Sequence, residues 1–334
     1  MAANMKAVKL RIKSVQSTMQ ITKAMELVAS SKLRRAKERS DECRPYFREL
    51  HQTLVDIAEG NTDFSSVYAK PAAGSSAKGS ASAAAGTTDR YCYVVIAGDR
   101  GLAGGYNSNI FKRLEADAAE HAASQTDANG GASAGSNYVV LPVGKKAVEY
   151  FKRRGVEILT EDFATVADIS VADCFEIARL LCKEYREGRF GHIELCYTEF
   201  VSMLSQRAEI YPMLPLTDLE SHGSLSADAP DAGSAAADAS SGDSPKKPIR
   251  NLILYEPDSS EVFDAIVPEY LGGFIYGGVC DSVASELAAR RNAMEAATSN
   301  AEEMIEKLNL SYNRARQASI TTEITEIVAG AEGV

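Results

Sequence analysis

Hydrophobic residues near the two ends of the chain follow heptad spacing, in which positions recur every three and four residues. Near the N-terminus the pattern comprises Val8, Ile12, Val15, Met19 and Thr22, with a second stripe at Ile21, Met25 and Val28. Near the C-terminus it comprises Leu287, Met294, Ala301, Leu308 and Ala315. We therefore expect two long helices, over residues 5–60 and 281–329, that pair with each other as an antiparallel coiled coil.

The middle of the chain alternates short β-branched runs with helical patterns, which predicts an α/β fold with a mainly parallel sheet. Expected strands cover 91–98, 138–144, 156–163 and 250–257, and expected helices cover 108–121, 145–154 and 173–187. Two further runs, 192–201 and 208–216, are separated by a short turn and predict an antiparallel hairpin. The whole indicates a Rossmann-like layer sandwich.

Three stretches rich in Ala, Gly and Ser, at residues 69–88, 122–137 and 221–247, are typical of flexible segments. We interpret the first as a linker and the other two as insertions. The expected order is an N-terminal coiled-coil helix (1–68), the linker (69–88), the α/β domain (89–257) and a C-terminal coiled-coil helix (258–334).

The predicted helices are too long to lie on the predicted domain. At about 1.5 Å per residue they would extend roughly 70 to 80 Å, whereas a domain of about 150 residues is around 40 Å across. We expect both helices to extend beyond it.

Composition excludes several function classes. The 36 Lys and Arg against 46 Asp and Glu give a net charge of −10, which argues against a nucleic-acid binder. No apolar run reaches the roughly 18 residues of a membrane helix, and the N-terminus lacks signal-peptide features, so we expect no direct membrane insertion. The six cysteines are scattered and contain no CxxC pair, which favours buried free thiols over zinc or disulfides.

The motif GDRGLAGGYN, residues 98–107, follows a strand and opens a helix, where a phosphate-binding loop would lie. It matches no known phosphate fingerprint, so a tight turn is the simpler interpretation. The four histidines are far apart in sequence. We predict no catalytic residue, cofactor or metal site, and a mechanical or binding role.

The first 40 residues contain ten Lys or Arg against two Glu, so the N-terminal helix is basic on an acidic protein. The apolar seam within it favours a protein partner over nucleic acid or a membrane surface. Four apolar residues near the C-terminus imply a pocket in another subunit: Ile320, Ile324, Ile327 and Val328.

Five segments resemble the γ subunit of F-type ATP synthases, in order and at similar spacing: residues 14–38, 98–107, 255–258, 285–305 and 310–331. The resemblance covers nearly the whole chain outside the three Ala/Gly/Ser-rich stretches. It implies the central rotor shaft of the F1 sector, a non-catalytic subunit that couples ion flow through the membrane c ring to ATP synthesis or hydrolysis.

The resemblance also implies partners and contact residues. The expected partners are the α and β subunits of the α3β3 hexamer, ε and the c ring, at the cytoplasmic face of the membrane. The expected contacts with β are Lys23, Met25, Arg316, Gln317 and Thr321. The expected contacts with the c ring are Tyr255 and Glu256. A loop at the foot of the shaft, expected near ε and the c ring, comprises Asp99, Arg100, Gly101, Gly104 and Gly105.

Two rival interpretations follow from the residues alone. One is a small-molecule α/β enzyme with a dimerising helical arm, against which the missing phosphate loop counts. The other is a nucleic-acid-binding protein that uses the basic helix, against which the overall acidity and the apolar seams count.

Overall fold

The computed structural model describes residues 2–60, 66–69, 90–126, 138–216, 256 and 258–332. The chain divides into two compact units. A helical unit comprises Met1–Arg34, Leu102–Gly104 and Leu287–Val334, and an α/β unit comprises Arg35–Gly101 and Gly105–Glu286. Two long helices, α1 (Ala2–Gly60) and α5 (Ser259–Glu332), contribute to both units. In the described part of the chain, no helix combines the length and apolarity needed to span a membrane.

The α/β unit contains a five-stranded sheet in the order β3-β2-β1-β4-β5. Its strands are β1 (Tyr91–Ile96), β2 (Tyr138–Val143), β3 (Glu157–Ile158), β4 (His192–Phe200) and β5 (Gln206–Leu214). The first four strands are parallel, and β5 is antiparallel to β4. This strand order is that of a Rossmann-like sheet, and the predicted hairpin is confirmed.

The shorter helices of the unit are α2 (Tyr106–Thr126), α3 (Lys145–Arg154) and α4 (Val171–Arg186), with a short 3-10 helix at Val166–Asp168. The strand predicted over 156–163 is much shorter, because only Glu157 and Ile158 pair with β2. Residues 122–126, assigned from composition to an insertion, continue α2, in keeping with the high helix propensity of alanine.

Several sequence expectations lie outside the described residues. They are nearly all of the 69–88 linker, residues 127–137, the whole of 221–247 and all but Glu256 of the strand expected at 250–257.

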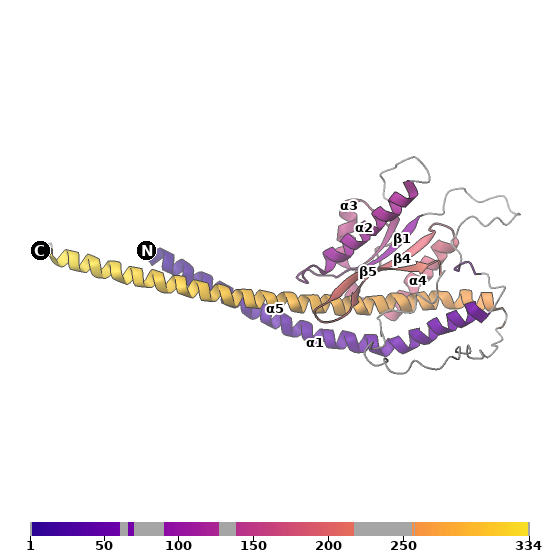
Figure 1. Ribbon diagram of the computed structural model, residues 1–334, viewed down its shortest axis with the longest axis horizontal. Coiled ribbons are helices and arrows are strands. Elements are labelled where there is room, and N and C mark those ends of the chain that lie inside the picture. Colours follow the sequence, from indigo (N-terminus) through magenta and orange to yellow (C-terminus); the bar gives the residue numbers. More distant parts are fainter. Residues whose placement is uncertain are drawn as a thin grey trace, which may run out of the picture. The chain divides into compact units, whose positions relative to one another are not determined.

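Helices cover both faces of the sheet (Figure 1). On one face, α2 and α3 pack against Tyr93 and Val95 of β1 and contribute Phe111 and Phe151. On the other face, α4, the first half of α5 and the end of α1 share a larger apolar core. Every residue of β1 after Tyr91 is buried, as expected for a parallel strand covered on both sides.

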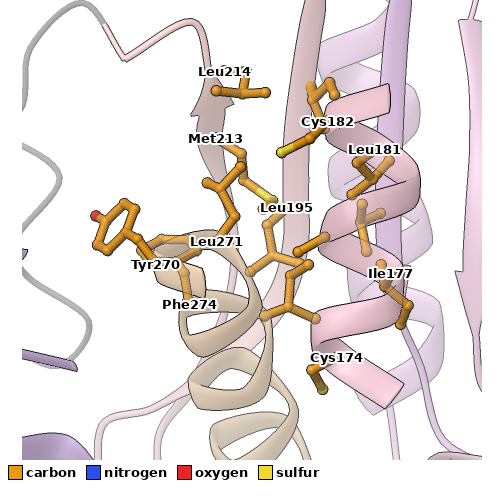
Figure 2. Packing of buried hydrophobic residues seen from close by; sticks show 14 of the residues in the cluster. Cys174, Ile177, Leu181, Cys182, Leu195, Met213, Leu214, Tyr270, Leu271 and Phe274 are labelled. Carbon is orange, nitrogen blue, oxygen red and sulfur yellow. The ribbon is translucent and has the colours of Figure 1, made fainter. Parts of the chain in front are cut away.

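Figure 2 shows part of this larger core. Its labelled side chains come from α4, β4, β5 and α5 and are Cys174, Ile177, Leu181, Cys182, Leu195, Met213, Leu214, Tyr270, Leu271 and Phe274. Leu195, Leu271 and Ile177 are at most 1% exposed. The first half of α5 is therefore part of the domain core.

The heptad pattern predicted an unbroken helix only from residue 281, although the C-terminal helical segment was expected from 258; α5 begins at Ser259. Pro268 and a run of glycines precede residue 281 and have poor helix propensity. The structure explains the glycines: a Cβ at Gly272 would lie 2.2 Å from a ring carbon of Phe175 on α4, and one at Gly273 would lie 2.1 Å from Phe47 on α1. Close packing of α5 against its neighbours thus outweighs local propensity.

In the helical unit, α1 and α5 run antiparallel (Figure 1). The positions predicted for the α1 seam are all partly buried, and the hydroxyl of its last member, Thr22, lies 2.8 Å from that of Thr298 on α5. On α5, the more buried positions again recur by three and four: Met294, Thr298, Ala301, Ile305, Leu308, Tyr312 and Ala315. The second stripe on α1 is largely solvent-facing, since Ile21 is 57% and Val28 is 54% exposed.

The five cysteines with described side chains are buried thiols, as predicted: Cys92, Cys174, Cys182, Cys196 and Cys280. Burial raises the pKa of the Cys92 and Cys174 thiols to about 12. Both thiols are therefore protonated, and unreactive, at neutral pH.

Gly144 provides a test of the sheet-to-helix geometry. It follows β2 with φ +104, and a Cβ there would lie 2.0 Å from the carbonyl oxygen of Ala97. Because backbone strain and a backbone clash coincide, we expect Gly144→Ala to lower the free energy of unfolding by at least about 3 kcal/mol. Urea denaturation of the full chain measures this loss.

Gly155→Ala is the matched control. Gly155 also has a positive φ, +69, but a Cβ there meets nothing within 4 Å. We expect it to cost only about 1 to 2 kcal/mol. Equal losses in the two variants would show that the contact with Ala97 does not constrain this turn.

Candidate functional site

The loop of residues 98–107 connects β1 to α2 at the carboxyl end of the central strand. β1 lies between β2 and β4, so this loop leaves the sheet at its topological switch point, where Rossmann-like folds commonly bind ligands. The sequence motif GDRGLAGGYN thus occupies the position in the fold that it was predicted to occupy.

Asp99 holds this loop against the rest of the α/β unit. Its carboxylate accepts hydrogen bonds from the backbone N–H groups of Lys145 (3.2 Å), Val166 (3.1 Å) and Ala167 (3.1 Å). The side chain of Asn107 accepts another from the backbone N–H of Gly98 (2.8 Å). Both polar side chains therefore face inward and serve the loop's own structure.

The remainder of the loop is exposed. Arg100, Gly101, Gly104 and Gly105 all face solvent. Between them Leu102 is 66% exposed and has a φ of 64, which is unusual for a residue other than glycine. An exposed leucine in a strained backbone conformation is a candidate partner contact.

The structure separates this loop from Glu256, one of the two residues predicted to contact the c ring. A Cβ at Gly98 would lie 2.9 Å from the carboxylate of Glu286, near the end of the α/β part of α5. Glu256 is exposed and lies just before the start of α5 at Ser259, and Tyr255 is outside the described residues. Since α5 from Ser259 to Glu286 is about 40 Å long, the loop and Glu256 are not brought together.

The helical unit exposes large apolar side chains along both helices. On α1 they are Leu10, Ile21, Leu27 and Val28, and on α5 they are Met304, Leu310, Ile320, Ile324, Ile327 and Val328. Ile327 is 71% exposed. So many exposed apolar side chains on two helices are unusual for an isolated soluble protein and indicate a protein partner.

The basic side chains predicted on the N-terminal helix are also on the surface. All ten are exposed: Lys6, Lys9, Arg11, Lys13, Lys23, Lys32, Arg34, Arg35, Lys37 and Arg39. The surface of α1 therefore combines positive charge with exposed apolar residues.

The residues expected to contact β lie at two levels of the helical unit. Lys23 is exposed and Met25 partly buried, close to the Thr22–Thr298 pair. Arg316, Gln317 and Thr321 are exposed, and the Thr321 hydroxyl donates to the carbonyl of Gln317 (2.9 Å). Because Arg316 lies about 27 Å along α5 from Thr298, the two sets do not form one patch.

One cluster was not found in the sequence. Asp117 and His121 on α2 meet Glu194 on β4, with ligand-type atoms that all lie within 4.8 Å of one another. The spacing of Asp117 and His121 places both on one face of a helix, which was a usable signal. Glu194 lies more than 70 positions away in sequence, and only the pairing of β4 with β1 brings it into the cluster.

Comparison with known proteins identifies the family. The family profile described as ATP synthase matches residues 4–334. The chain is 43% identical over 326 residues to the ATP synthase gamma chain of Ruminococcus albus, covering 97% of this chain and 96% of that one.

The chain belongs to the ATP synthase gamma-chain family. It is also 34% identical over 338 residues to the sodium-ion-specific ATP synthase gamma chain of Acetobacterium woodii, with all of both chains covered. Gamma-chain family membership thus extends over the whole length.

Chains from solved structures of mitochondrial ATP synthases have a fold similar to that of this chain. A chain of the Euglena gracilis mitochondrial ATP synthase, OSCP/F1/c-ring in rotational state 3, aligns with a TM-score of 0.55 at 16% identity, covering 100% of this chain and 95% of that one. A chain of the Tetrahymena thermophila central stalk and c ring aligns with a TM-score of 0.50 at 19% identity, covering 83% of this chain and 99% of that one. At such identities the alignments support the shared fold.

Asp99 and Arg100 allow the structural and the exposed parts of the loop to be separated. Asp99→Ala removes the acceptor of three backbone N–H groups. We therefore expect it to lower the free energy of unfolding of the isolated chain by about 1 to 3 kcal/mol. The control, Arg100→Ala at an exposed position, should stay within about 0.5 kcal/mol. Thermal melts compare the two, and an unchanged Asp99→Ala melt would refute the structural role.

Proposed function

We propose that this chain is the central rotor shaft of the F1 sector of an F-type ATP synthase. The single observation that carries the proposal is the helical unit, whose antiparallel helices expose apolar and basic side chains along their length. A partner that surrounds the helices would cover both kinds of surface. Family membership supports the same assignment.

The shaft itself is proposed to be an antiparallel coiled coil of α1 and α5. The alternating three- and four-residue spacing of the partly buried positions supports this, because it is the spacing of a coiled-coil seam. Small seam residues such as Ala301 and Ala315 would let the two helices approach closely.

The proposed shaft has no active site of its own and would act on the catalytic β subunits by rotating. Because α1 and α5 carry different exposed residues, the shaft presents a different face to each of three β subunits at any rotary angle. Contacts that differ between the three would favour a different conformation in each β subunit. Rotation of the shaft would change the conformation of each β subunit in turn. Torque from ion flow through the c ring would thereby drive ATP synthesis, and ATP hydrolysis would rotate the shaft in the opposite direction.

Two levels of contact with β follow from the positions of the predicted residues. Lys23 and Met25 would meet β near the Thr22–Thr298 level, and Arg316, Gln317 and Thr321 would meet it about 27 Å farther along α5. The exposed basic residues of α1 would face acidic surface on the hexamer, which steers and orients assembly.

The other partners are proposed to bind the α/β unit. Glu256, with Tyr255, would face the polar loops of the c ring. The exposed residues Arg100, Gly101, Gly104 and Gly105, held by Asp99, would form the loop proposed to lie near ε and the c ring. A partner that contacts both the loop and Glu256 would have to span about 40 Å along α5. The assembly would place this chain, as a peripheral subunit, at the cytoplasmic face of the membrane.

Reconstitution tests the proposal against its rivals. We expect the purified chain, mixed with the α and β subunits of its own complex, to form a stable complex with enhanced ATPase activity. Calorimetry should show no micromolar ATP binding to the isolated chain. Tight nucleotide binding by the isolated chain would favour a small-molecule enzyme, and salt-dependent binding of DNA or RNA without complex formation would favour a nucleic-acid-binding protein.

The double variant Arg316→Ala and Gln317→Ala tests the outer contact with β. Both side chains are exposed, so circular dichroism and melting of the isolated chain should be unchanged. Losing charge-assisted hydrogen bonds, each typically about 1.5 to 3 kcal/mol, should reduce the yield or the ATPase rate of the reconstituted complex severalfold.

Arg314→Ala is its control, because Arg314 is equally exposed but lies about 200° around the helix from Arg316. Full activity of the double variant would remove the pair from the interface. A large drop in the melting temperature of the free chain would instead assign the pair to its own fold.

A further inference from the structure

A polar cluster lies on the α2 side of the sheet, within an otherwise apolar layer. Glu194 on β4 is the register partner of Tyr93 on β1, so the two side chains project from the same face of the sheet. Asp117 and His121 come from the second half of α2, one turn apart. The cluster therefore joins a strand to the helix that covers it.

The three side chains are arranged around His121. Its Nε2 atom lies 3.2 Å from Oδ2 of Asp117 and 3.7 Å from Oε1 of Glu194. The side chains of Asp117 and Glu194 are 14% and 12% exposed, and that of His121 is 33% exposed. One side of the cluster is therefore open to solvent, while both carboxylates lie inside the protein.

The cluster lacks enough positive charge and donors for its two carboxylates. Oε2 of Glu194 is buried and accepts no hydrogen bond from the described part of the chain. Burial, and then the nearby Asp117 carboxylate, raises the pKa of Glu194 above its usual range. Arg113 on α2 opposes this only in part. A buried carboxylate of this kind is stabilised by a proton or by a bound cation.

We propose that Asp117, His121 and Glu194 form a binding site for a divalent transition-metal ion of the zinc type. One imidazole nitrogen and two carboxylate oxygens are three ligands of a tetrahedral site, and water would supply the fourth. Ligand atoms that share such an ion at about 2.0 to 2.2 Å lie about 3.4 Å apart. The two distances from His121 Nε2 bracket this separation.

The donor set selects the class of ion. Magnesium and calcium prefer sites made only of oxygen ligands, whereas an imidazole suits zinc, cobalt and nickel. Cysteine is absent from the cluster, so a purely thiolate-binding metal is not favoured.

Two tyrosines hold the ligands in place. The Tyr93 hydroxyl donates a hydrogen bond to Oδ2 of Asp117 (2.9 Å), which fixes that carboxylate. The ring of Tyr91 stacks on that of His121, with centroids 4.2 Å apart. Supporting contacts of this kind are what orient metal ligands in established sites. The site is thus largely formed before the ion binds.

The experiment uses the full chain without an affinity tag, stripped of metal by chelator. We expect calorimetry to show one zinc ion bound per chain, and thermal melting to show a higher melting temperature with zinc, because ligands of the folded state stabilise it. Cobalt(II) should give a visible absorption band that zinc abolishes, and magnesium at the same concentration should neither bind nor raise the melting temperature.

Two ligand variants and one control assign the site. Glu194→Gln and His121→Asn should each weaken zinc binding at least tenfold and remove the cobalt band. The control is His192→Asn. The ring of His192 stacks on that of Tyr91, with centroids 4.7 Å apart, as the ring of His121 does, but His192 is not one of the three ligands. It should bind zinc within about twofold of the unmodified chain.

Other results would overturn the proposal. Absence of zinc binding by the unmodified chain, or equal binding by Glu194→Gln, would show that a proton shared within the cluster neutralises it instead. If a ligand variant fails to fold, zinc protection of His121 against diethylpyrocarbonate in the unmodified chain decides the question, since modification at an unchanged rate would exclude His121 as a ligand.

Discussion

The packing of the first half of α5 against the sheet is the interaction on which the rest of the structure depends. Leu271 and Phe274 of this segment lie in the larger core with α4 and β5, and Gly272 and Gly273 allow the helix to approach Phe175 and Phe47. A side chain at either glycine would occupy the space of an aromatic ring. Close approach here therefore determines which face of α5 is buried in the α/β unit.

The same helix serves two purposes because its surroundings change along its length. Up to Glu286 it belongs to the α/β unit, and from Leu287 to its end it belongs to the helical unit. In the helical unit only one seam is shielded by α1, and Ile324 and Ile327 face outward. An uninterrupted helix with a buried first half and an exposed second half suits a part that is anchored at one end and recognised by partners at the other.

The loop after β1 divides its residues between structure and recognition in a similar way. Asp99 and Asn107 bind backbone groups and hold the turn, while Arg100 and Leu102 are left on the surface. The Asp117–His121–Glu194 cluster lies elsewhere, between α2 and β4, and uses none of these residues. A bound ion there would stabilise the α/β unit without involving the residues of this loop.

The sequence by itself determined the element types, the parallel sheet with its terminal hairpin, and the spacing of the helical seams. These follow from local periodicity: β1 is a continuous apolar run, and the seam from Val8 to Thr22 repeats every three and four residues. Family resemblance added the functional class, because its motifs lie along nearly the whole chain. The tertiary structure alone decided the burial of the first half of α5 in the α/β core, the two levels of the predicted β contacts and the presence of Glu194 beside His121. Each of these depends on residues distant in sequence, whose packing outweighs local propensity or unites side chains that no spacing along the chain connects.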